Sequence, residues 1–123
     1  GIDIVEISRI EKILIKRMDQ FYHRIFTDNE VLYMRNKNDN PRTVAGIFAS
    51  KEAVAKALGS GIGKLAWKDI EILHDENGKP RVNINEQIKK QLGNLGLDSI
   101  EISISHEREY AVATAICFFN SRF

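Results

Sequence analysis

Four side chains could act together in a reaction although they stand far apart in the sequence. Asp3 lies in an apolar alternating run, Glu52 and Lys56 are four residues apart, and His106 follows a second alternating run. An acid on an otherwise apolar strand face has to be paired, hydrogen-bonded or bound to a metal, because an isolated charge is costly to bury. Two carboxylates from different elements suit a hard divalent ion such as Mg²⁺, which shares its shell with water and phosphate oxygens.

A cation and a glycine-rich turn accompany this acid pair. Phe48, Glu52 and Lys56 are spaced four apart, so a helix stacks them on one face. Lys56 could reach a phosphate beside the metal, and the turn over residues 59–63 (GSGIG) would let a ligand approach the backbone. The turn is not a P-loop, because it lacks that spacing and follows a helix rather than a strand. The alternative interpretation is a surface Glu–Lys pair that stabilises its helix by ~0.2–0.5 kcal/mol.

Composition limits the classes of protein and site. At 123 residues the chain is expected to form one domain, 1–123, and its net charge of +1 argues against a nucleic-acid binder. The single cysteine, Cys117, excludes an intrachain disulfide and a cysteine metal cluster, which favours a reducing, cytoplasmic location. Without closely spaced histidines a zinc site is not expected. No apolar run is long enough to cross a bilayer and no signal-peptide pattern is present, so no membrane association is expected.

Local patterns predict the elements that position these side chains. Helices are predicted over residues 9–18, 28–35, 41–58 and 86–94. Strands are predicted over residues 1–7, 69–73, 80–84, 99–105 and 110–119. The predicted helix-end signals are Ser8, the Thr27–Glu30 capping box, Asn40 with Pro41, Gly59 and Asn85. The long helix over 41–58 therefore carries Glu52 and Lys56.

The order of these elements predicts an α+β fold, with a mainly antiparallel sheet packed against the long central helix and shorter helices. Short turns, such as the one at Asn77-Gly78, favour hairpins over crossover connections. The last strand is apolar on both faces, so we expect it to be central in the sheet.

The helix predicted over residues 9–18 carries a stripe of basic residues. Its members are Arg9, Lys12 and Lys16, with Arg17 beside them and Arg24 further on. A solvated helix face is one interpretation of such a stripe. The other is a docking surface for an acidic protein, where the charges act on encounter rate and orientation.

Several short motifs, in order over nearly the whole chain, resemble the holo-acyl-carrier-protein synthase family of small bacterial phosphopantetheinyl transferases. The matching segments are 1–7 (GIDIVEI) with Arg9, 48–53 (FASKEA) with Lys56-Ala57, 59–62 (GSGI), 67–71 (WKDIE), 77–80 (NGKP) and 103–106 (SISH). Each segment is weak alone, and their shared order is what makes the resemblance specific. One departure is Ile47, at a position where members often carry a basic residue, which puts one cofactor contact in doubt.

The resemblance implies a reaction. The phosphopantetheine group of coenzyme A would pass to a serine of an apo acyl carrier protein, with Mg²⁺ required and adenosine 3',5'-bisphosphate released, in support of fatty acid biosynthesis. It implies Asp3 and Glu52 as metal ligands and Glu52 and Lys56 as catalytic residues. The proton acceptor is left open between a water on the metal and Glu52. A homotrimer with sites at subunit interfaces is also implied.

The resemblance assigns binding roles as well. The implied cofactor-binding residues are Lys56, Gly59, Ser60, Gly61 and His106, with His106 at the nucleotide end. The implied docking residues for the acidic carrier protein are Arg9, Arg17, Phe21 and Arg24.

Two other functions are compatible with the same residues. A nucleotide-binding hydrolase would use the acid pair to release adenosine bisphosphate from coenzyme A without a carrier protein. A non-enzymatic adaptor would dock an acidic helix on the Arg9–Arg24 region, and its salt-sensitive binding would survive the loss of Glu52 and Lys56.

Overall fold

The structure is a computed structural model that describes residues 1–59 and 65–120. Its helices are α1 (Ile7–Ile25), α2 (Asp28–Asn36), α3 (Pro41–Leu58) and α4 (Glu86–Asn94), with a short 3-10 helix, η1 (Trp67–Asp69). Its strands are β1 (Ile2–Glu6), β2 (Ile70–His74), β3 (Pro80–Ile84), β4 (Leu97–His106) and β5 (Tyr110–Phe119). None of the described helices could cross a membrane, since none is both long and apolar enough.

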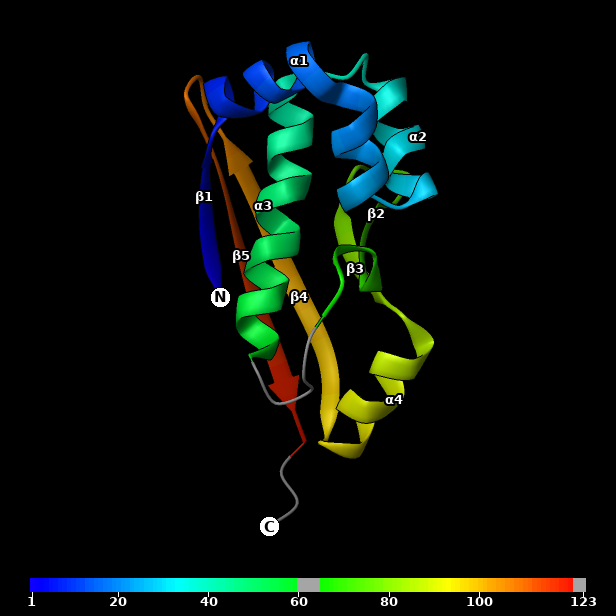
Figure 1. Ribbon diagram of the computed structural model, residues 1–123. Coiled ribbons are helices and arrows are strands. Elements are labelled where there is room, and N and C mark those ends of the chain that lie inside the picture. The colour runs from blue at the N-terminus through cyan, green and yellow to red at the C-terminus, as the bar shows by residue number, and fades with distance from the viewer. Residues whose placement is uncertain (60–64, 121–123) are drawn as a thin grey trace.

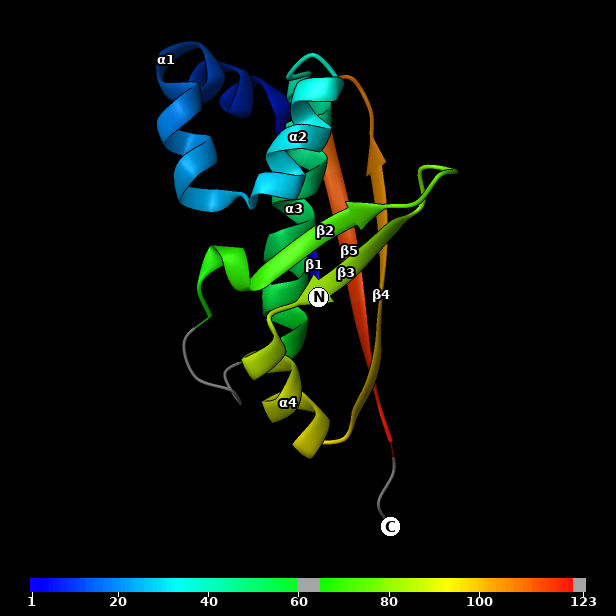
Figure 2. The ribbon, with the colours of Figure 1, turned by 90° about the vertical axis from the view of Figure 1, so that its right-hand side faces the viewer.

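The predicted α+β fold with antiparallel pairing is confirmed, but the strands form two sheets. In the larger sheet the order is β1-β5-β4, so the last strand is central, as its apolar character predicted. In its register, Asp3 of β1 lies opposite Ala113 of β5, and His106 of β4 lies opposite Ala111. The hairpin β2–β3 makes the second sheet and lies across the first at the β4 side (Figure 2).

Helix α3 packs along the inner face of the larger sheet, with β1 on one side of it and the β2–β3 hairpin on the other (Figure 1). The contact surface is built from small side chains that are fully buried, namely Ala49, Ala53, Ala111, Ala113 and Ala115. Small residues let a helix and a sheet approach closely. At Gly46 an added Cβ would lie 3.2 Å from Cγ2 of Ile104, so the helix is already in tight contact with β4 there.

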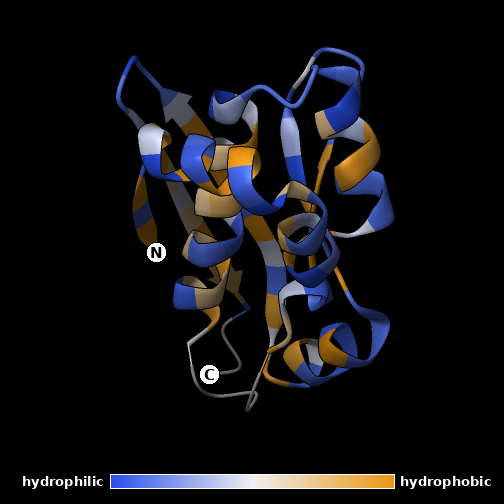
Figure 3. Cartoon of the chain, turned by 45° about the horizontal axis from the view of Figure 1, so that its top comes forward, coloured by the Kyte–Doolittle hydropathy of each residue, from blue (hydrophilic) through white to orange (hydrophobic). Residues whose placement is uncertain are grey.

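No element of the described residues covers the other face of the larger sheet. Ile2 and Ile4 of β1 are each 61% exposed, and Ile116 and Phe118 of β5 are also exposed. Hydrophobic and hydrophilic residues alternate along the strands and form stripes on the helices (Figure 3). Exposed apolar groups gathered on one face are typical of a surface that contacts another chain.

The predicted helix ends are mostly confirmed. Asn40 caps α3, since its side-chain oxygen accepts a hydrogen bond of 3.0 Å from the backbone N–H of Arg42. Gly59 follows α3 with φ of +69°, a conformation in which an L side chain would be strained. The capping box of Thr27 and Glu30 begins α2. Asn85 caps α4 in the same manner.

The prediction for the first helix was wrong at both ends. Helix α1 begins at Ile7, so Ser8 is not its N-cap; the Ser8 hydroxyl donates instead to the Glu6 carboxylate at 2.9 Å. The strand gives way to the helix where Ile7 N–H bonds the Glu109 carbonyl at 2.8 Å and its side chain enters the core. The helix continues to Ile25 through a kink at Arg17, whose φ of −154° is not helical.

Candidate active site

The structure brings three of the four reactive side chains together between β1 and α3. The Nζ of Lys56 lies 2.9 Å from Oδ1 of Asp3 and donates to the Ile2 carbonyl at 3.2 Å. The Asp3 side chain is 17% exposed and that of Lys56 is 53% exposed, so the pair lies at the edge of the core. Glu52, one helical turn before Lys56, is close enough to both for their charges to alter its pKa.

A glycine explains how the strand comes so close to the helix. A Cβ at Gly1 would lie 2.3 Å from the carbonyl oxygen of Ala53 and 2.9 Å from the backbone nitrogen of Ala57. Any other residue at Gly1 would therefore push β1 away from α3. The closeness of the strand is what places Asp3 against the helix face that carries Glu52 and Lys56.

The electrostatics of this cluster favour a bound cation. Burial raises the pKa of Glu52, the negative charge of Asp3 raises it further, and Lys56 opposes the shift. The hydrogen bond and the charge of Asp3 raise the pKa of Lys56. Two carboxylates held near each other repel, and a divalent cation between them would remove that repulsion.

The donor set is of the kind that Mg²⁺ uses. Asp3 and Glu52 offer hard oxygen ligands, and the described part of the chain has no group of three or more His, Cys, Asp or Glu residues that could hold a metal. Mg²⁺ is usually held by one or two carboxylates together with water and substrate phosphates, rather than by an all-protein cage.

A groove of about 970 Å³ runs along α1 and ends on α3. All four residues predicted to dock a carrier protein line it, namely Arg9, Arg17, Phe21 and Arg24. Lys12 and Lys16 add to its positive charge, and the kink of α1 places basic residues of both helix halves along one groove.

The apolar end of this groove is an aromatic cluster next to the acid pair. The rings of Phe48 and Trp67 stack with centroids 5.3 Å apart, and Phe21 lies 5.9 Å from Phe48. Phe48 is one helical turn before Glu52, on the same face of α3. The apolar end of the groove is therefore one helical turn from Glu52.

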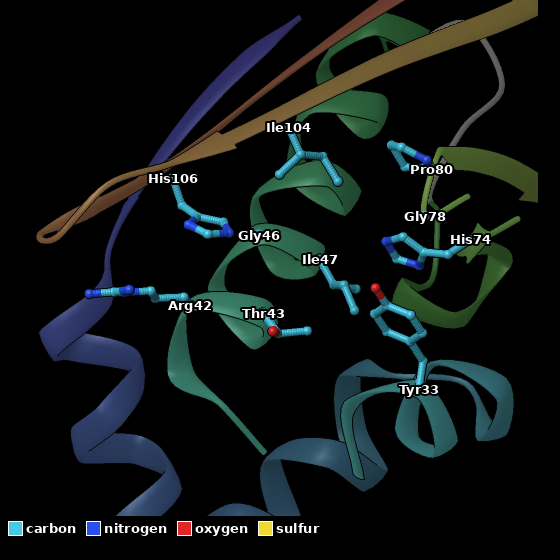
Figure 4. Close-up of a pocket in the computed structure, with 10 residues that line it drawn as sticks. All are labelled: Tyr33, Arg42, Thr43, Gly46, Ile47, His74, Gly78, Pro80, Ile104 and His106. Atoms are coloured by element: carbon cyan, nitrogen blue, oxygen red, sulfur yellow. The ribbon is translucent and has the colours of Figure 1, made fainter. Parts of the chain in front are cut away.

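His106 lies elsewhere, in a smaller pocket of about 210 Å³ on the β4 side of α3. One end of this pocket carries Arg42 and His106, and the other carries Tyr33 and His74 with Gly78 and Pro80 of the β2–β3 hairpin (Figure 4). Ile47 lies between the two ends and is almost fully buried, so the pocket is apolar at the position where the sequence departs from the family pattern. Its volume is below the range typical of a whole drug-sized ligand, so it suits one part of a larger molecule.

The glycine turn is only partly described. Gly59 is exposed just after α3, whereas Ser60 and Gly61, also predicted to bind the cofactor, lie outside the described residues. The roles predicted for these three residues stay predictions.

The sequence analysis did not identify several residues that line the smaller pocket, nor the buried ion pair that holds the neighbouring elements together. Arg42, Tyr33 and His74 had no motif that marked them. Lys51, in the segment that resembles the family, is fully buried and bonds to Glu30 at 2.7 Å. An apolar neighbourhood on α3 could have signalled that this lysine needs a buried partner, but not which acid supplies it.

Comparison with known proteins decides the family. The model of the 4'-phosphopantetheinyl transferase superfamily matches residues 1–115. The chain belongs to this family. It is 51% identical to the holo-[acyl-carrier-protein] synthase of Caldicellulosiruptor saccharolyticus, over 94% of this chain and 92% of that one. It is 49% identical to the synthase of Alkaliphilus oremlandii, over 94% of each chain. The enzyme class predicted from the sequence, a phosphopantetheinyl transferase of the holo-[acyl-carrier-protein] synthase type, is confirmed.

Solved structures of the same family have the same fold. The Helicobacter pylori synthase in complex with coenzyme A superposes with a TM-score of 0.83 at 35% identity, over 96% of this chain and 98% of that one. The Bacillus anthracis synthase in complex with coenzyme A (3',5'-ADP) gives a TM-score of 0.74 at 38% identity, over 95% and 92%. The predicted phosphopantetheinyl-transferase-like fold is therefore confirmed.

Proposed function

We propose that this enzyme transfers the phosphopantetheine group of coenzyme A to a serine hydroxyl of an apo acyl carrier protein, in support of fatty acid biosynthesis. The observation that carries the proposal is the position of Glu52. It lies one turn of α3 beyond Phe48, which lines the end of the basic groove, and it is close to Asp3 of β1. An acidic carrier protein held in that groove would present its serine to a phosphate held at the acid pair. The similar proteins named holo-[acyl-carrier-protein] synthase support the same reaction.

Coenzyme A as the donor is supported by the smaller pocket. Arg42 supplies positive charge at one end, and Arg42 and His106 both offer hydrogen-bond donors there, which suits the 3'-phosphate of the nucleotide. The family members from Helicobacter pylori and Bacillus anthracis were solved in complex with coenzyme A. The apolar Ile47 would leave the phosphate to Arg42 and His106.

Asp3 and Glu52 would hold the Mg²⁺ ion. When bound, the ion would neutralise the charge that develops on the pyrophosphate oxygens. The serine Oγ forms a bond to the phosphorus nearer the pantetheine, the bond from that phosphorus to the bridging oxygen breaks, and adenosine 3',5'-bisphosphate leaves.

Residues of the chain itself would contact the phosphates, accept the serine proton and bind the cofactor. Lys56, paired with Asp3, is half-exposed and so is able to turn toward the pyrophosphate or the leaving group. Glu52, whose carboxylate is close to Asp3 and Lys56, is the residue of this chain proposed to accept the serine proton. Gly59, Ser60 and Gly61 would let the cofactor approach the backbone just after α3.

The site is proposed to form between subunits of a homotrimer. Helix α3 separates the acid pair on the β1 side from the nucleotide pocket on the β4 side (Figure 1), so one coenzyme A molecule would reach both most easily across two chains. The uncovered apolar face with Ile4 and Phe118 supports an oligomer. Residues 1–123 would form one transferase domain, acting in the cytoplasm.

The first test is the intact mass of an apo acyl carrier protein after incubation with this enzyme, coenzyme A and Mg²⁺, with and without a chelator. We expect a gain of one phosphopantetheine, and the chelator should prevent it. No gain with the folded enzyme and several carrier proteins would overturn the proposal.

The same experiment separates the alternatives. A hydrolase would release adenosine bisphosphate from coenzyme A when no carrier protein is present. An adaptor would bind the carrier protein in a salt-sensitive way and modify nothing, and the Glu52→Gln variant would bind as well as the unmodified chain.

A further inference from the structure

The kink at Arg17 divides α1 into two halves, residues 7–16 and 18–25. Each half supplies residues to the basic groove, for example Arg9 from the first and Arg24 from the second. Backbone hydrogen bonds set the direction of a helix only while they are uninterrupted, so the kink leaves the direction of the second half to its other contacts. The shape of the groove therefore depends on what holds residues 18–25 in place.

Arg35 of α2 holds the second half of α1 immediately after the kink. Its Nη2 donates to Oδ1 of Asp19 at 3.3 Å, and its Nη1 donates to Sδ of Met18 at 3.2 Å. The guanidinium also lies over the ring of Tyr22, 5.0 Å from the ring centroid. Figure 1 shows α1 crossing the top of the molecule and then turning down beside α2. One planar cation thus contacts three side chains within one turn of the second half.

Asp39, in the connection between α2 and α3, completes this network. Its carboxylate accepts from the Tyr22 hydroxyl at 2.9 Å and from Nη1 of Arg35 at 3.3 Å. Its φ of +52° is uncommon for a residue other than glycine, and its backbone N–H donates to the Met34 carbonyl at 2.9 Å. That bond ties Asp39 to the end of α2. Arg35 and Asp39 therefore hold the second half of α1 from one common support.

The network acts on the groove from behind. In the described part of the chain, the groove is lined by neighbours of these residues, such as Phe21, and not by Arg35 or Asp19. The side chain of Asp19 is 92% exposed and that of Arg35 is 43% exposed, and exposed ion pairs add little to the stability of a whole fold. The effect of these contacts therefore falls on the direction of residues 18–25.

We propose that Arg35 is a positioning residue for the carrier protein. Through Asp19 and Tyr22 it holds the second half of α1 at the angle at which both halves contact the docked protein. This inference rests on the proposed docking of an acidic carrier protein in the groove. If the second half were free to move, it would spend less time in the orientation that binds, and the apparent affinity falls with that fraction. The reaction at the acid pair would be unaffected once the carrier is bound.

The test compares two variants that change the charge of the enzyme in opposite directions. Arg35→Gln removes a positive charge and Asp19→Asn removes a negative charge, yet each breaks the same contact. In both variants the KM for the apo acyl carrier protein should rise roughly twofold to fivefold, while kcat and the KM for coenzyme A stay unchanged. An effect of surface charge alone would instead make Asp19→Asn bind the acidic carrier more tightly.

Three further variants serve as controls. Glu11→Gln removes the same charge as Asp19→Asn, but from the first half of α1, where Glu11 is exposed and makes no ion pair with another described residue. It should not raise the KM for the carrier protein. Arg35→Lys keeps the charge but loses the planar fork, so it should still raise that KM. The double variant Arg35→Gln/Asp19→Asn should be no worse than either single variant, because both remove one interaction.

Amide hydrogen exchange measures the same effect without a carrier protein or turnover. In Arg35→Gln and in Asp19→Asn, the amides of residues 18–25 should exchange faster, while those of residues 8–16 and of α3 keep their rates. Unchanged exchange over residues 18–25, an unchanged KM for the carrier protein, or tighter carrier binding by Asp19→Asn would overturn the positioning role. An equal rise in the KM for both substrates would overturn it as well.

Calorimetric titration with the carrier protein separates this inference from the proposed function. If the unmodified enzyme binds the carrier protein but transfers nothing, weaker binding by both variants would overturn the transferase alone. If transfer is normal and both variants bind the carrier protein as tightly as the unmodified enzyme, only the role of Arg35 is overturned. A carrier protein that does not bind the unmodified enzyme would overturn both.

Discussion

At the scale of single residues, the proposed metal site would take one carboxylate from Asp3 and one from Glu52, so we expect each residue to be indispensable. We expect Asp3→Asn and Glu52→Gln to lower turnover by roughly two to three orders of magnitude, as loss of transition-state charge stabilisation does elsewhere. Both changes conserve shape, and neither residue is fully buried. The measurement is the rate of carrier-protein modification, with thermal unfolding as the control for folding. Near-normal rates in both variants would contradict the proposed metal site.

The pKa of Glu52 gives a second prediction at this scale. Because Asp3 raises that pKa and Lys56 lowers it, Asp3→Asn should lower the pKa of Glu52 and Lys56→Met should raise it. The measurement is an NMR titration of the Glu52 side-chain carboxyl carbon, which needs no activity. Shifts of the same sign in both variants would contradict the arrangement.

At the scale of elements, one buried ion pair joins three of them. The Nζ of Lys51 on α3 bonds Glu30 of α2 at 2.7 Å and the Ile70 carbonyl of β2 at 2.5 Å. The second carboxylate oxygen of Glu30 accepts from the Ile72 N–H at 2.8 Å, and both ionised side chains have no exposed area. The pair therefore fixes the hairpin that carries His74 relative to the helix that carries Glu52.

Breaking this pair should be costly. Lys51→Met leaves the Glu30 carboxylate buried without its cation, so we expect the free energy of unfolding to fall by about 3–5 kcal/mol. The double variant Glu30→Gln/Lys51→Met should lose less than the sum of the two single variants, because no unpaired charge remains. Urea unfolding of all four proteins measures this coupling. Strictly additive losses would mean that the two charges do not stabilise each other.

At the scale of the whole molecule, the separation of the acid pair from the nucleotide pocket predicts complementation between copies. Glu52→Gln and the double variant Arg42→Glu/His106→Ala should each be nearly inactive. When the two are unfolded and refolded together, about a quarter of the sites in a randomly mixed cyclic trimer would combine an intact acid pair with an intact pocket. Turnover should then reappear. Activity no greater than the sum of the separate variants would place each site within one chain.

Much of this molecule follows from short-range sequence patterns. Asn40, Pro41 and Gly59 predict the limits of α3, and the alternating runs predict β3 and β5 at their observed ends. These signals work because caps, turns and strand alternation depend on neighbouring residues that satisfy backbone hydrogen bonds locally. The spacing of Glu52 and Lys56, with the acid in the first strand, was likewise enough to predict a two-carboxylate cluster.

The remaining features depend on contacts between residues distant in the sequence. Tyr33 and His74 are brought together only by the packing of α2 on the β2–β3 hairpin, as are Glu30 and Lys51 by the packing of α2 on α3. The kink at Arg17 and the start of α1 at Ile7 also follow from packing, since local helix propensity favours neither. The sequence by itself therefore determined most of the elements and indicated the candidate reactive residues. Only the tertiary structure decided which distant side chains meet, because that depends on how closely the elements approach.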